Sequence, residues 1–560
     1  MNYSKYKSLT EFLEDNNIKN MLVESKKCDK CKEQEEEVQE ETKEQSEEEE
    51  ENGEKGNPLK THELDVVYSN MDDKPTNIFK HIIVFTNDDD PKNNKTLKNI
   101  YDAVERLKKA KCEIIPEIHT FVAADIEADE MEEEIVITDG DKKLTIKEES
   151  NIDTLIFARL GVQDEDQCEH IVKLLQDRGF LVLNPVQYSA VACDKYDSAV
   201  LFEKGEIPQP KFTLMTKDIL YDEKLYSEAM KSVYPKWNDK DNDKNEDFSF
   251  VVKILDGHGG TGVAMLNGKN ILAVLQMIFA IDPERRLILQ KKEEADGGDI
   301  RVHVLTLRDK QVILAAMKRV KLGGDFRSNV SLGATAEKVK LTPEQEQIAL
   351  KTARLSKLPW CAVDIMPLVK GSNPEIGDNV VLEINASPGT DGISEVIEHN
   401  FINVLLNELD DPSQFMLQDK TAGFIETVTV DFGEGVKKDL LAKLDTGNGA
   451  KASHIEVGDY EIDGNKVKFS LEGKQFEYEI KDYSHAKTGE QEHNRPIIVI
   501  PELTLGLRKL KNVEMAIVKV REKSTNALLN REVLSKMGYI VHPNNTHVLT
   551  KEMEKVKIIN

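Results

Sequence analysis

An apolar segment late in the chain carries polar side chains where a buried strand would have none. It reads VVLEINASPGTDG over residues 380–392, with Glu383 and Asn385 two positions apart. Successive side chains of a strand point to opposite faces, so these two oxygen-bearing side chains share one face. The apolar residues that pack behind them are Leu382, Ile384 and Ala386. The pattern predicts a strand with one core face and one polar face.

A second segment has the same form. It reads WCAVDIMP over residues 360–367, and its single acidic residue is Asp364. If the two strands pair, Asp364, Glu383 and Asn385 converge on a hard cation such as Mg²⁺, which prefers oxygen ligands and shares them with substrate phosphates. The alternative is that these side chains lie on the water-exposed face of an antiparallel sheet.

A lysine and a glycine-rich stretch indicate phosphate binding. In FSFVVKILDGHGGTGV, residues 248–263, Lys253 lies in an apolar strand directly before the glycines at 257–262. Glycine lets backbone N–H groups approach phosphate oxygens, and a buried lysine needs an anion close by. The stretch is not a Walker loop because no GK[ST] follows it, and an ordinary hairpin is the alternative.

Basic side chains gather in the same part of the chain. GGDIRVHVL, residues 297–305, places Asp299 and Arg301 at strand spacing. MKRVKLGGDFRSN, residues 317–329, adds a group of cationic and amide side chains: Lys318, Arg319, Lys321, Arg327 and Asn329. The chain has 75 Lys and Arg against 103 Asp and Glu, a formal net charge of -28. Local positive density in so acidic a protein favours a pocket for phosphate and carboxylate groups, with a solvated basic face as the alternative.

The net charge also limits the partners. Duplex nucleic acid and anionic membranes need clustered basic surface, so neither is expected as the main partner, whereas a basic protein partner fits. No apolar run is long enough to span a bilayer, and the start of the chain lacks the features of a secretory leader. We expect a soluble cytoplasmic protein.

The chain divides into four parts and predicts a multidomain fold of the α/β and α+β classes. Residues 1–77 form an acidic, largely disordered tail, and residues 78–190 alternate between strands and helices as an α/β domain does. Residues 191–410 contain the polar strands, the glycines and the basic cluster. Residues 411–560 are rich in short strands separated by turns, which predicts a small all-β barrel or sandwich.

Two segments of the α/β part show its pattern. A helix is predicted over residues 95–110, where apolar residues recur at helical spacing: Leu97, Ile100, Ala103, Val104 and Leu107. The acidic segment at residues 124–149 is expected to form a surface hairpin.

The acidic tail has two readings. Residues 32–60 are almost entirely polar, so they act either as a solvated spacer or as a segment that recruits a basic partner. Just before them Cys28 and Cys31 have metal or redox spacing, but no second pair of ligands follows.

Taken in order, the motifs of residues 80–410 resemble those of the RimK-type ATP-grasp ligases, a family that joins glutamate to the C-terminus of a small-subunit ribosomal protein. The similarity is carried by NPVQYSAVACDKYDS, the strand with Lys253, GHGGTGV, DIR, AAMKRV, GDFRSN, VDI and VLEINASPG. The resemblance implies an N-terminal pre-ATP-grasp domain, followed by a two-lobed ATP-grasp fold.

The resemblance implies a role for each matching residue. The ATP contacts would be Lys195, Lys253, Gly259, Gly260, Thr261, Gln290, Lys291, Lys292 and Asp299. Mg²⁺ or Mn²⁺ would be held by Asp364, Glu383 and Asn385, and Arg301 would be catalytic by steadying the phosphoryl group. The acyl and amino-acid substrates would face Arg319, Arg327, Ser328 and Asn329. Relatives have an acidic and an aromatic residue where this chain has Lys291 and Lys292, which puts the nucleotide preference in doubt.

By the same resemblance, the activity is ATP-dependent joining of a carboxylate to an amine through an acyl phosphate. The acceptor would be a protein or peptide carboxylate, including a basic ribosomal protein, the donor a free amino acid such as glutamate, and the assembly a homo-oligomer. Two alternatives stay open: a ligase of small-molecule amino acids or peptides, and a non-catalytic nucleotide-binding adaptor.

The C-terminal part resembles the retropepsin-like domain that is found alone or fused to RimK-type ligases and is often called an ATP-dependent zinc protease. The similarity lies in LLAKLDTGNGAKASH, residues 440–454, and ALLNREVLSKMGYIVHP, residues 527–543. It implies an aspartic-peptidase-like barrel with Asp445 as the catalytic acid, and a single DTG implies a dimer because two carboxylates must meet. Asn530 replaces the usual turn glycine, and no HExxH supports zinc. Hydrolysis and peptide binding both remain open.

Overall fold

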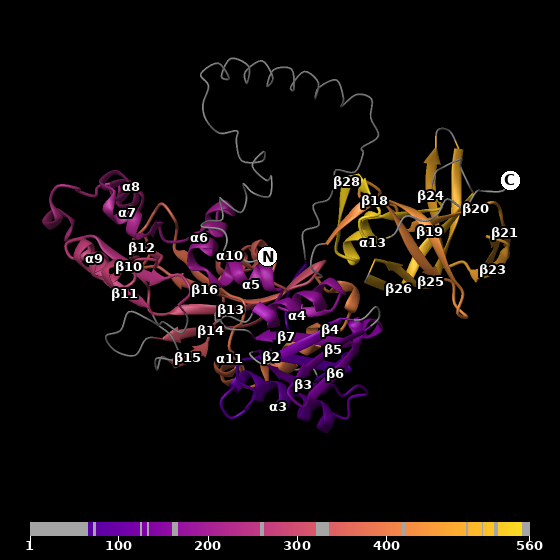
Figure 1. Cartoon of the computed structure of the whole chain (residues 1–560), viewed down its shortest axis with the longest axis horizontal. Coiled ribbons are helices and arrows are strands. Elements are labelled where there is room, and N and C mark those ends of the chain that lie inside the picture. Colours follow the sequence, from indigo (N-terminus) through magenta and orange to yellow (C-terminus); the bar gives the residue numbers. More distant parts are fainter. Residues whose placement is uncertain are drawn as a thin grey trace, which may run out of the picture. The chain divides into compact units, whose positions relative to one another are not determined.

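The computed structural model (Figure 1) describes most of the chain beyond the acidic segment. The described residues are 65–70, 74–123, 126–130, 134–159, 166–257, 262–320, 335–416, 420–488, 491–506, 508–519 and 525–550. The segment 32–60 and both cysteines at 28 and 31 lie outside them. Ordered structure begins earlier than the predicted boundary at residue 78, because Asp65–Tyr68 already form strand β1.

A parallel four-stranded sheet forms the first α/β layer, with the strand order β3-β2-β7-β8. Its elements are β2 (His81–Thr86), α3 (Lys95–Ala110), β3 (Glu117–Val122), β7 (Thr154–Arg159), α4 (Asp166–Asp177) and β8 (Leu181–Leu183). Helix α3 begins where the Asn94 side chain accepts the Leu97 N–H, 3.0 Å away, and its predicted apolar face is confirmed as buried. That face packs on the sheet in one hydrophobic core.

The acidic segment after β3 differs from the predicted hairpin. It forms a separate antiparallel sheet of three strands, β4 (Ile126–Glu130), β5 (Glu134–Asp139) and β6 (Lys142–Lys147), followed by the 3₁₀ turn Glu148–Asp153. Ile135, Ile137 and Ile146 pack on the other face of the parallel sheet. Val136, between the first two, is buried as well. The apolar run of β5 therefore explains how so acidic a segment buries one side.

A smaller antiparallel sheet follows, with the strand order β11-β10-β12-β9. The elements from its entry onward are α5 (Val186–Cys193), α6 (Lys195–Lys204), β9 (Phe212–Met215), α7 (Lys217–Tyr221), α8 (Glu223–Val233), η5 (Asn242–Asn245), β10 (Ser249–Ile254), β11 (Val263–Asn267), α9 (Ile271–Ile281) and β12 (Leu287–Lys291). Residues of α8 and α9 bury one face of the sheet, and residues of α6 pack on part of the other face.

A larger sheet carries both polar strands, in the order β1-β14-β13-β16-β17 with β15 paired to β14. Its elements are β13 (Asp299–Thr306), β14 (Lys310–Val320), β15 (Thr335–Lys338), α10 (Pro343–Ser356), β16 (Trp360–Pro367), β17 (Asn379–Asn385), α11 (Asp391–Ile397), α12 (Phe401–Glu408) and η7 (Pro412–Gln414). Helix α10 starts with a capping box of Thr342 and Gln345, which the order of residues at 342–345 predicts. Its apolar face packs on β13, β16 and β17.

The last part is a barrel, as its short strands predict. Six strands close a ring because β25 pairs with both β26 and β18, in the order β25-β26-β20-β27-β19-β18. The strands and the helix of this part are β18 (Lys420–Asp431), β19 (Lys437–Asp445), β20 (Ser453–Val457), β21 (Tyr460–Asp463), β22 (Lys466–Leu471), β23 (Lys474–Glu479), β24 (Asp482–Thr488), β25 (Gln491–Leu505), β26 (Arg508–Lys519), β27 (Ala527–Asn530), α13 (Arg531–Lys536) and β28 (Tyr539–Thr546). Their inward apolar side chains form a core of their own.

No helix within the described ranges is both long enough and apolar enough to cross a bilayer.

Candidate functional site

The polar side chains of the larger sheet line up in one row across three strands. Arg301 on β13 lies directly opposite Asp364 on β16, and Asp364 lies directly opposite Glu383 on β17. Directly opposite residues in an antiparallel pair point to the same face, where they interact. The predicted pairing of the two acidic strands is therefore present, and it includes the arginine of the third strand.

A β-bulge shapes the end of this row. The register between β16 and β17 shifts after Asp364, so that Ile365 lies opposite Val381 and Leu382 has no partner of its own. Leu382 is half-buried, unlike Ile384 and Ala386, which are in the core. The prediction that Leu382 packs behind the polar face is wrong for this reason.

Two arginines hold Asp364 in place. Arg301 donates to both of its carboxylate oxygens, from Nε at 2.7 Å and from Nη2 at 2.6 Å. Arg319 Nη2 donates to Asp364 Oδ2 at 2.7 Å, and the same guanidinium makes a two-pronged contact with Asp299, both bonds 2.7 Å long. Arg319 is 4% exposed, so it faces the interior rather than a substrate, which differs from its predicted role. The four charges form a chain of contacts in the order Arg301, Asp364, Arg319 and Asp299.

The network fixes the charge of Asp364. Burial alone would raise its pKa, but Arg301 and Arg319 outweigh burial and hold the pKa of Asp364 well below its ordinary value. Burial by itself would lower the pKa of Arg319, and the two carboxylates beside it raise the pKa far above the ordinary value instead. Both groups therefore stay ionised throughout the physiological pH range.

The oxygen donors for a metal ion differ in their exposure and in the hydrogen bonds that they already accept. Asp364 already accepts three N–H groups, whereas Glu383 is 40% exposed in its side chain and has Arg301 Nη2 3.9 Å from Oε1. Asn385 Oδ1 accepts the N–H of Ser387 at 2.8 Å and keeps a second lone pair. Glu383 and Asn385 fit Mg²⁺ as direct ligands, and Asp364 could add its remaining lone pair.

Two lysines bring positive charge toward this row. Burial lowers the pKa of Lys253 on β10 below its ordinary value. The charges of Glu383 and Asp364 oppose this effect and raise the pKa in part. Lys195, the first residue of α6, donates from Nζ to the carbonyls of Leu255 and Gly257 in the turn after β10. Strand β10 of the smaller sheet and the start of α6 therefore each bring one lysine near the acidic face of the larger sheet.

The charges of this region sum to a small positive excess. Four cations, Arg301, Arg319, Lys195 and Lys253, face three carboxylates, Asp299, Asp364 and Glu383. The formal surplus is one positive charge before any metal ion is bound. Such a surplus in a chain of net charge -28 suits a polyanion such as a nucleotide phosphate tail.

The predicted adenine hinge lies at the end of β12. Gln290 is buried, Lys292 is exposed, and Lys291 Nζ lies 3.1 Å from Glu293 Oε1. Glu293 also accepts a hydrogen bond from Asn373 Nδ2 at 3.0 Å, so an acidic residue is close to the hinge although not at the expected position. Asp299 belongs to the arginine network instead of the hinge.

Part of the predicted site falls outside the described residues. This applies to Gly259, Gly260 and Thr261 of the glycine-rich stretch and to Arg327, Ser328 and Asn329 of GDFRSN. The last glycine of the stretch is described: Gly262 has φ +71, and a Cβ there would lie 2.4 Å from the Ile254 side chain. The turn between β10 and β11 therefore requires glycine at this point.

Two residues of the first α/β layer position the row, and the sequence pattern does not reveal them. Asn184 donates from Nδ2 to the carbonyls of Trp360 and Ala386, which lie at the start of β16 and just after β17. Arg159 Nη1 donates to the Pro388 carbonyl at 3.0 Å. The only sequence signal for either residue is a polar side chain beside a buried strand, which many surface positions share.

The C-terminal barrel places Asp445 at the end of β19. This strand runs parallel to β27, with Asp445 opposite Asn530, and Asp445 Oδ1 accepts the Gly447 N–H at 3.2 Å. Lys443 Nζ lies 3.4 Å from Asp445 Oδ2. The side chain is 29% exposed, so its carboxylate is accessible at the edge of the barrel.

Asn530 stands where the resemblance to retropepsin-like domains implies a glycine, and the backbone there does not need one. Its φ is -82 and ψ is 170, which any residue adopts. The side chain caps α13 by accepting the Val533 N–H, and it donates to the Ala450 carbonyl at 2.7 Å. The substitution thus links the turn after Asp445 to β27.

Comparison with known proteins agrees with the central part of this assignment. Residues 192–409 match the family model of the RimK-like ATP-grasp domain. The matched segment includes Lys195, Lys253 and the three strands that carry the row.

Curated relatives match over part of the chain. A probable alpha-L-glutamate ligase of Maridesulfovibrio salexigens is 32% identical over 164 residues, which are 29% of this chain and 51% of that protein. One from Trichodesmium erythraeum is 29% identical over 240 residues, 42% of this chain and 70% of that protein. The chain spans about half the length of most of the curated relatives it matches.

Among solved structures, the ATP-grasp ligase PsnB complexed with a minimal precursor aligns with a TM-score of 0.41 and 15% identity, over 60% of this chain and 98% of that one. D-alanyl-alanine synthetase A from Vibrio cholerae aligns with a TM-score of 0.39 and 13% identity, over 60% of this chain and 99% of that one.

Proposed function

We propose that the chain is an ATP-dependent ligase that joins the carboxylate of a protein or peptide to the amine of an amino acid, with glutamate as the first choice. The observation that carries the proposal is the row of Arg301, Asp364 and Glu383, faced by Lys253, inside the segment that matches the RimK-like domain. The names of the curated relatives support glutamate as the amino acid.

The proposed reaction has two steps. An oxygen of the acceptor carboxylate attacks the γ-phosphorus of ATP, the bond to the bridging oxygen of ADP breaks, and an acyl phosphate forms. The amino-acid nitrogen then attacks the acyl carbon, inorganic phosphate leaves, and the nitrogen loses a proton as the amide forms. No covalent bond to the protein is needed, so positioning and charge compensation supply the catalysis.

Each side chain of the row has a defined part in these steps. Lys253 and Lys195 bind phosphate oxygens of the nucleotide, and Arg301 stabilises the charge on the transferred phosphoryl group. Glu383, Asn385 and Asp364 hold the magnesium ion, which neutralises the phosphate tail when it is bound. Arg319 and Asp299 keep Asp364 and Arg301 in register and do not themselves contact substrate.

ADP formation from ATP and Mg²⁺ tests this proposal. We expect it to be fast only when both a peptide ending in glutamate and a free amino acid are present, with the product peptide heavier by one or more amino-acid residues in mass spectrometry. Removal of Mg²⁺ by EDTA is expected to stop the reaction.

The same assay separates the alternatives. Turnover with a free small acid and no peptide would favour a small-molecule ligase. ATP binding without turnover across all amino acids and peptides tried would favour the non-catalytic adaptor.

For the C-terminal barrel we propose a peptidase-like role in trimming the tail that the ligase extends. Asp445 at the exposed end of β19, in a loop tied to β27 through Asn530, supports this role. Because one chain supplies one such carboxylate, hydrolysis requires two barrels to meet so that one acid is ionised and the other protonated.

Replacing Asp445 by asparagine is expected to remove trimming of a polyglutamate tail while ligation stays unchanged. Asparagine keeps the oxygen that accepts the Gly447 N–H, so the loop is preserved. Tail length is followed by mass spectrometry, with Asp439→Asn on the same strand as the matched control. Equal trimming by the wild type and Asp445→Asn would leave peptide binding as the function of the barrel.

A further inference from the structure

Three potential metal ligands meet on the first α/β layer, outside the site described above. His81 is the first residue of β2 and Glu117 the first residue of β3, and the two are paired in the parallel register. His119 follows two positions after Glu117, so both point to the same face of the sheet. In the described ranges, this is the one group of three or more His, Cys, Asp or Glu side chains whose ligand atoms all lie within 4.8 Å of each other.

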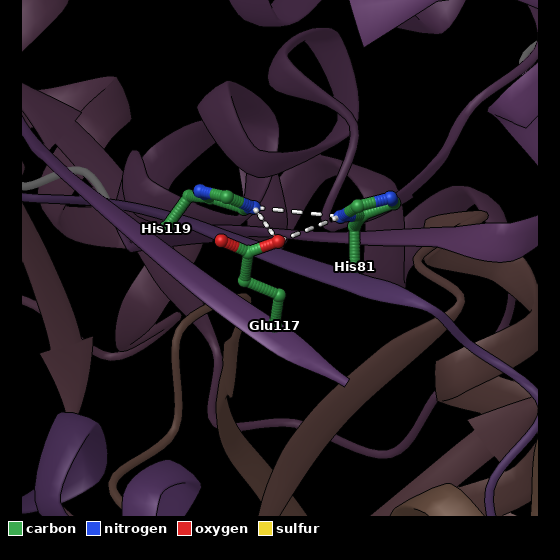
Figure 2. Close-up of side chains that lie close together, drawn as sticks. All are labelled: His81, Glu117 and His119. Atoms are coloured by element: carbon green, nitrogen blue, oxygen red, sulfur yellow. Dashed lines mark hydrogen bonds and ion pairs between the residues drawn. The ribbon is translucent and has the colours of Figure 1, made fainter. Parts of the chain in front are cut away.

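The ligand atoms converge on one point. His119 Nε2 lies 3.4 Å from His81 Nδ1 and 3.7 Å from Glu117 Oε2, and His81 Nδ1 lies 4.0 Å from the same oxygen. Figure 2 shows one nitrogen of each ring turned toward the other ring, with the Glu117 carboxylate beside the gap between them. A zinc ion with bonds of about 2.0–2.1 Å holds tetrahedral ligands about 3.3 Å apart, so closure requires shifts of only a few tenths of an ångström.

The chemistry of the group selects the class of ion. Two imidazoles and one carboxylate suit Zn²⁺ and related transition-metal ions, whereas Mg²⁺ prefers an all-oxygen set. His119 has a side chain 17% exposed and Glu117 one 68% exposed, so the group is anchored on one side and open to water on the other. Three protein ligands with one open position are typical of exchangeable or reactive zinc sites rather than closed structural ones.

A buried hydroxyl lies next in the same row. Thr154 on β7 is the register partner of His81 on the side away from Glu117, and it shares the face of His81. Thr154 is 1% exposed, and its Oγ1 has no hydrogen-bond partner within the described part of the chain. A buried hydroxyl without a partner is uncommon, and a metal-bound water or a reoriented imidazole would satisfy it.

The group is separate from the nucleotide site. Arg159, which contacts Pro388 beside the row, is the last residue of β7, whereas His81 and Thr154 are the first residues of their strands. Six residues of strand span about 16 Å, so the two sites lie at opposite edges of the same sheet.

We propose that His81, Glu117 and His119 bind a zinc-class divalent transition-metal ion that joins the starts of β2 and β3 and leaves one coordination position open to solvent. The inference does not depend on the ligase proposal, because the ligands belong to a different face and edge of the molecule.

Metal binding by the full chain tests this proposal. A Cys28→Ser/Cys31→Ser background removes the two closely spaced thiols that could bind the same ion. After chelator treatment, we expect Zn²⁺ to bind with one ion per chain, and Co²⁺ to give the strong visible absorption of a four- or five-coordinate complex. His81→Ala and His119→Ala are expected to weaken Zn²⁺ binding at least about a hundredfold, because each removes a direct ligand.

Two further variants make the result decisive. Glu117→Gln keeps the size of an exposed side chain and therefore the fold, and we expect about tenfold or more weaker binding. His542→Ala, an exposed histidine on β28, is the matched control and should bind as the parent does. Equal Zn²⁺ affinity in the parent, Glu117→Gln and His119→Ala, or weak six-coordinate cobalt absorption, would overturn the proposal.

Discussion

Replacing Glu383 by glutamine is expected to reduce ATP-dependent amide formation at least about a hundredfold while the protein stays folded. The change keeps the size of the side chain and removes one negative charge from the face where the metal ion and the phosphates are proposed to meet. Glu383 is the accessible carboxylate of the row, since both oxygens of Asp364 are already used by arginines. ADP release and the mass of the product peptide measure the effect.

The pKa of Glu383 explains why folding should survive this change. Partial burial of the side chain raises that pKa above the ordinary value, and the nearby charge of Asp364 raises it further, while Arg301 and Lys253 lower it in part. A carboxyl group with a raised pKa favours the folded state at low pH, and this benefit is lost as the pH rises through the folded pKa. At neutral pH the ionised group therefore opposes folding, so Glu383→Gln should be at least as stable as the wild type.

A matched control exists on the loop before the same strand. Glu375 is exposed and pairs with Lys211 at 2.8 Å, a surface contact of small energetic value. Glu375→Gln should keep full activity and full stability. Full activity in Glu383→Gln as well would remove Glu383 from the proposed metal site, and lost stability in that variant would contradict its charge assignment.

The polar row shows how far the sequence can predict such a site. Strand periodicity places Glu383 and Asn385 on one face, and the apolar context of Asp364 indicates a second strand of the same kind. Periodicity cannot supply the register, however, and the register decides that Asp364 faces Glu383 on one side and Arg301 on the other. The bulge at Leu382 is equally invisible, because it arises from how two distant segments align.

Contacts between segments far apart in sequence explain the other differences. Arg319 carries the same charge as Lys318 before it, so the sequence does not distinguish them. Only the strand pairing shows that Arg319 is buried against Asp299, in the supporting role proposed above. His81 and His119 are 38 positions apart and lie on neighbouring strands, so no local spacing marks them as a pair. The Glu-x-His pattern at 117–119 is the one local signal, and it is common in exposed strands.

Replacing Arg319 by methionine is expected to destabilise the fold by about 3–5 kcal/mol. Methionine matches the volume and the apolar stem of arginine but leaves Asp299 without its two-pronged partner and Asp364 with one arginine instead of two. Breaking one side of a buried ion network is costly because a desolvated charge remains, whereas removing both sides costs much less. Urea unfolding of the wild type and the variant measures the difference.

The pH dependence and a double variant identify the cause of that loss. Because the arginines lower the pKa of Asp364, its contribution to stability is complete above the ordinary carboxyl pKa of about 3.9 and is lost as the pH falls through the lower, folded value. The difference between wild type and Arg319→Met should therefore be constant from neutral pH down to about pH 5 and narrow only below about pH 4. Adding Asp299→Leu to Arg319→Met should recover much of the lost stability, because the buried Asp299 carboxylate that has lost its arginine partner is then removed. A double variant no more stable than Arg319→Met would mean that the unpaired Asp299 carboxylate does not cause the loss of stability.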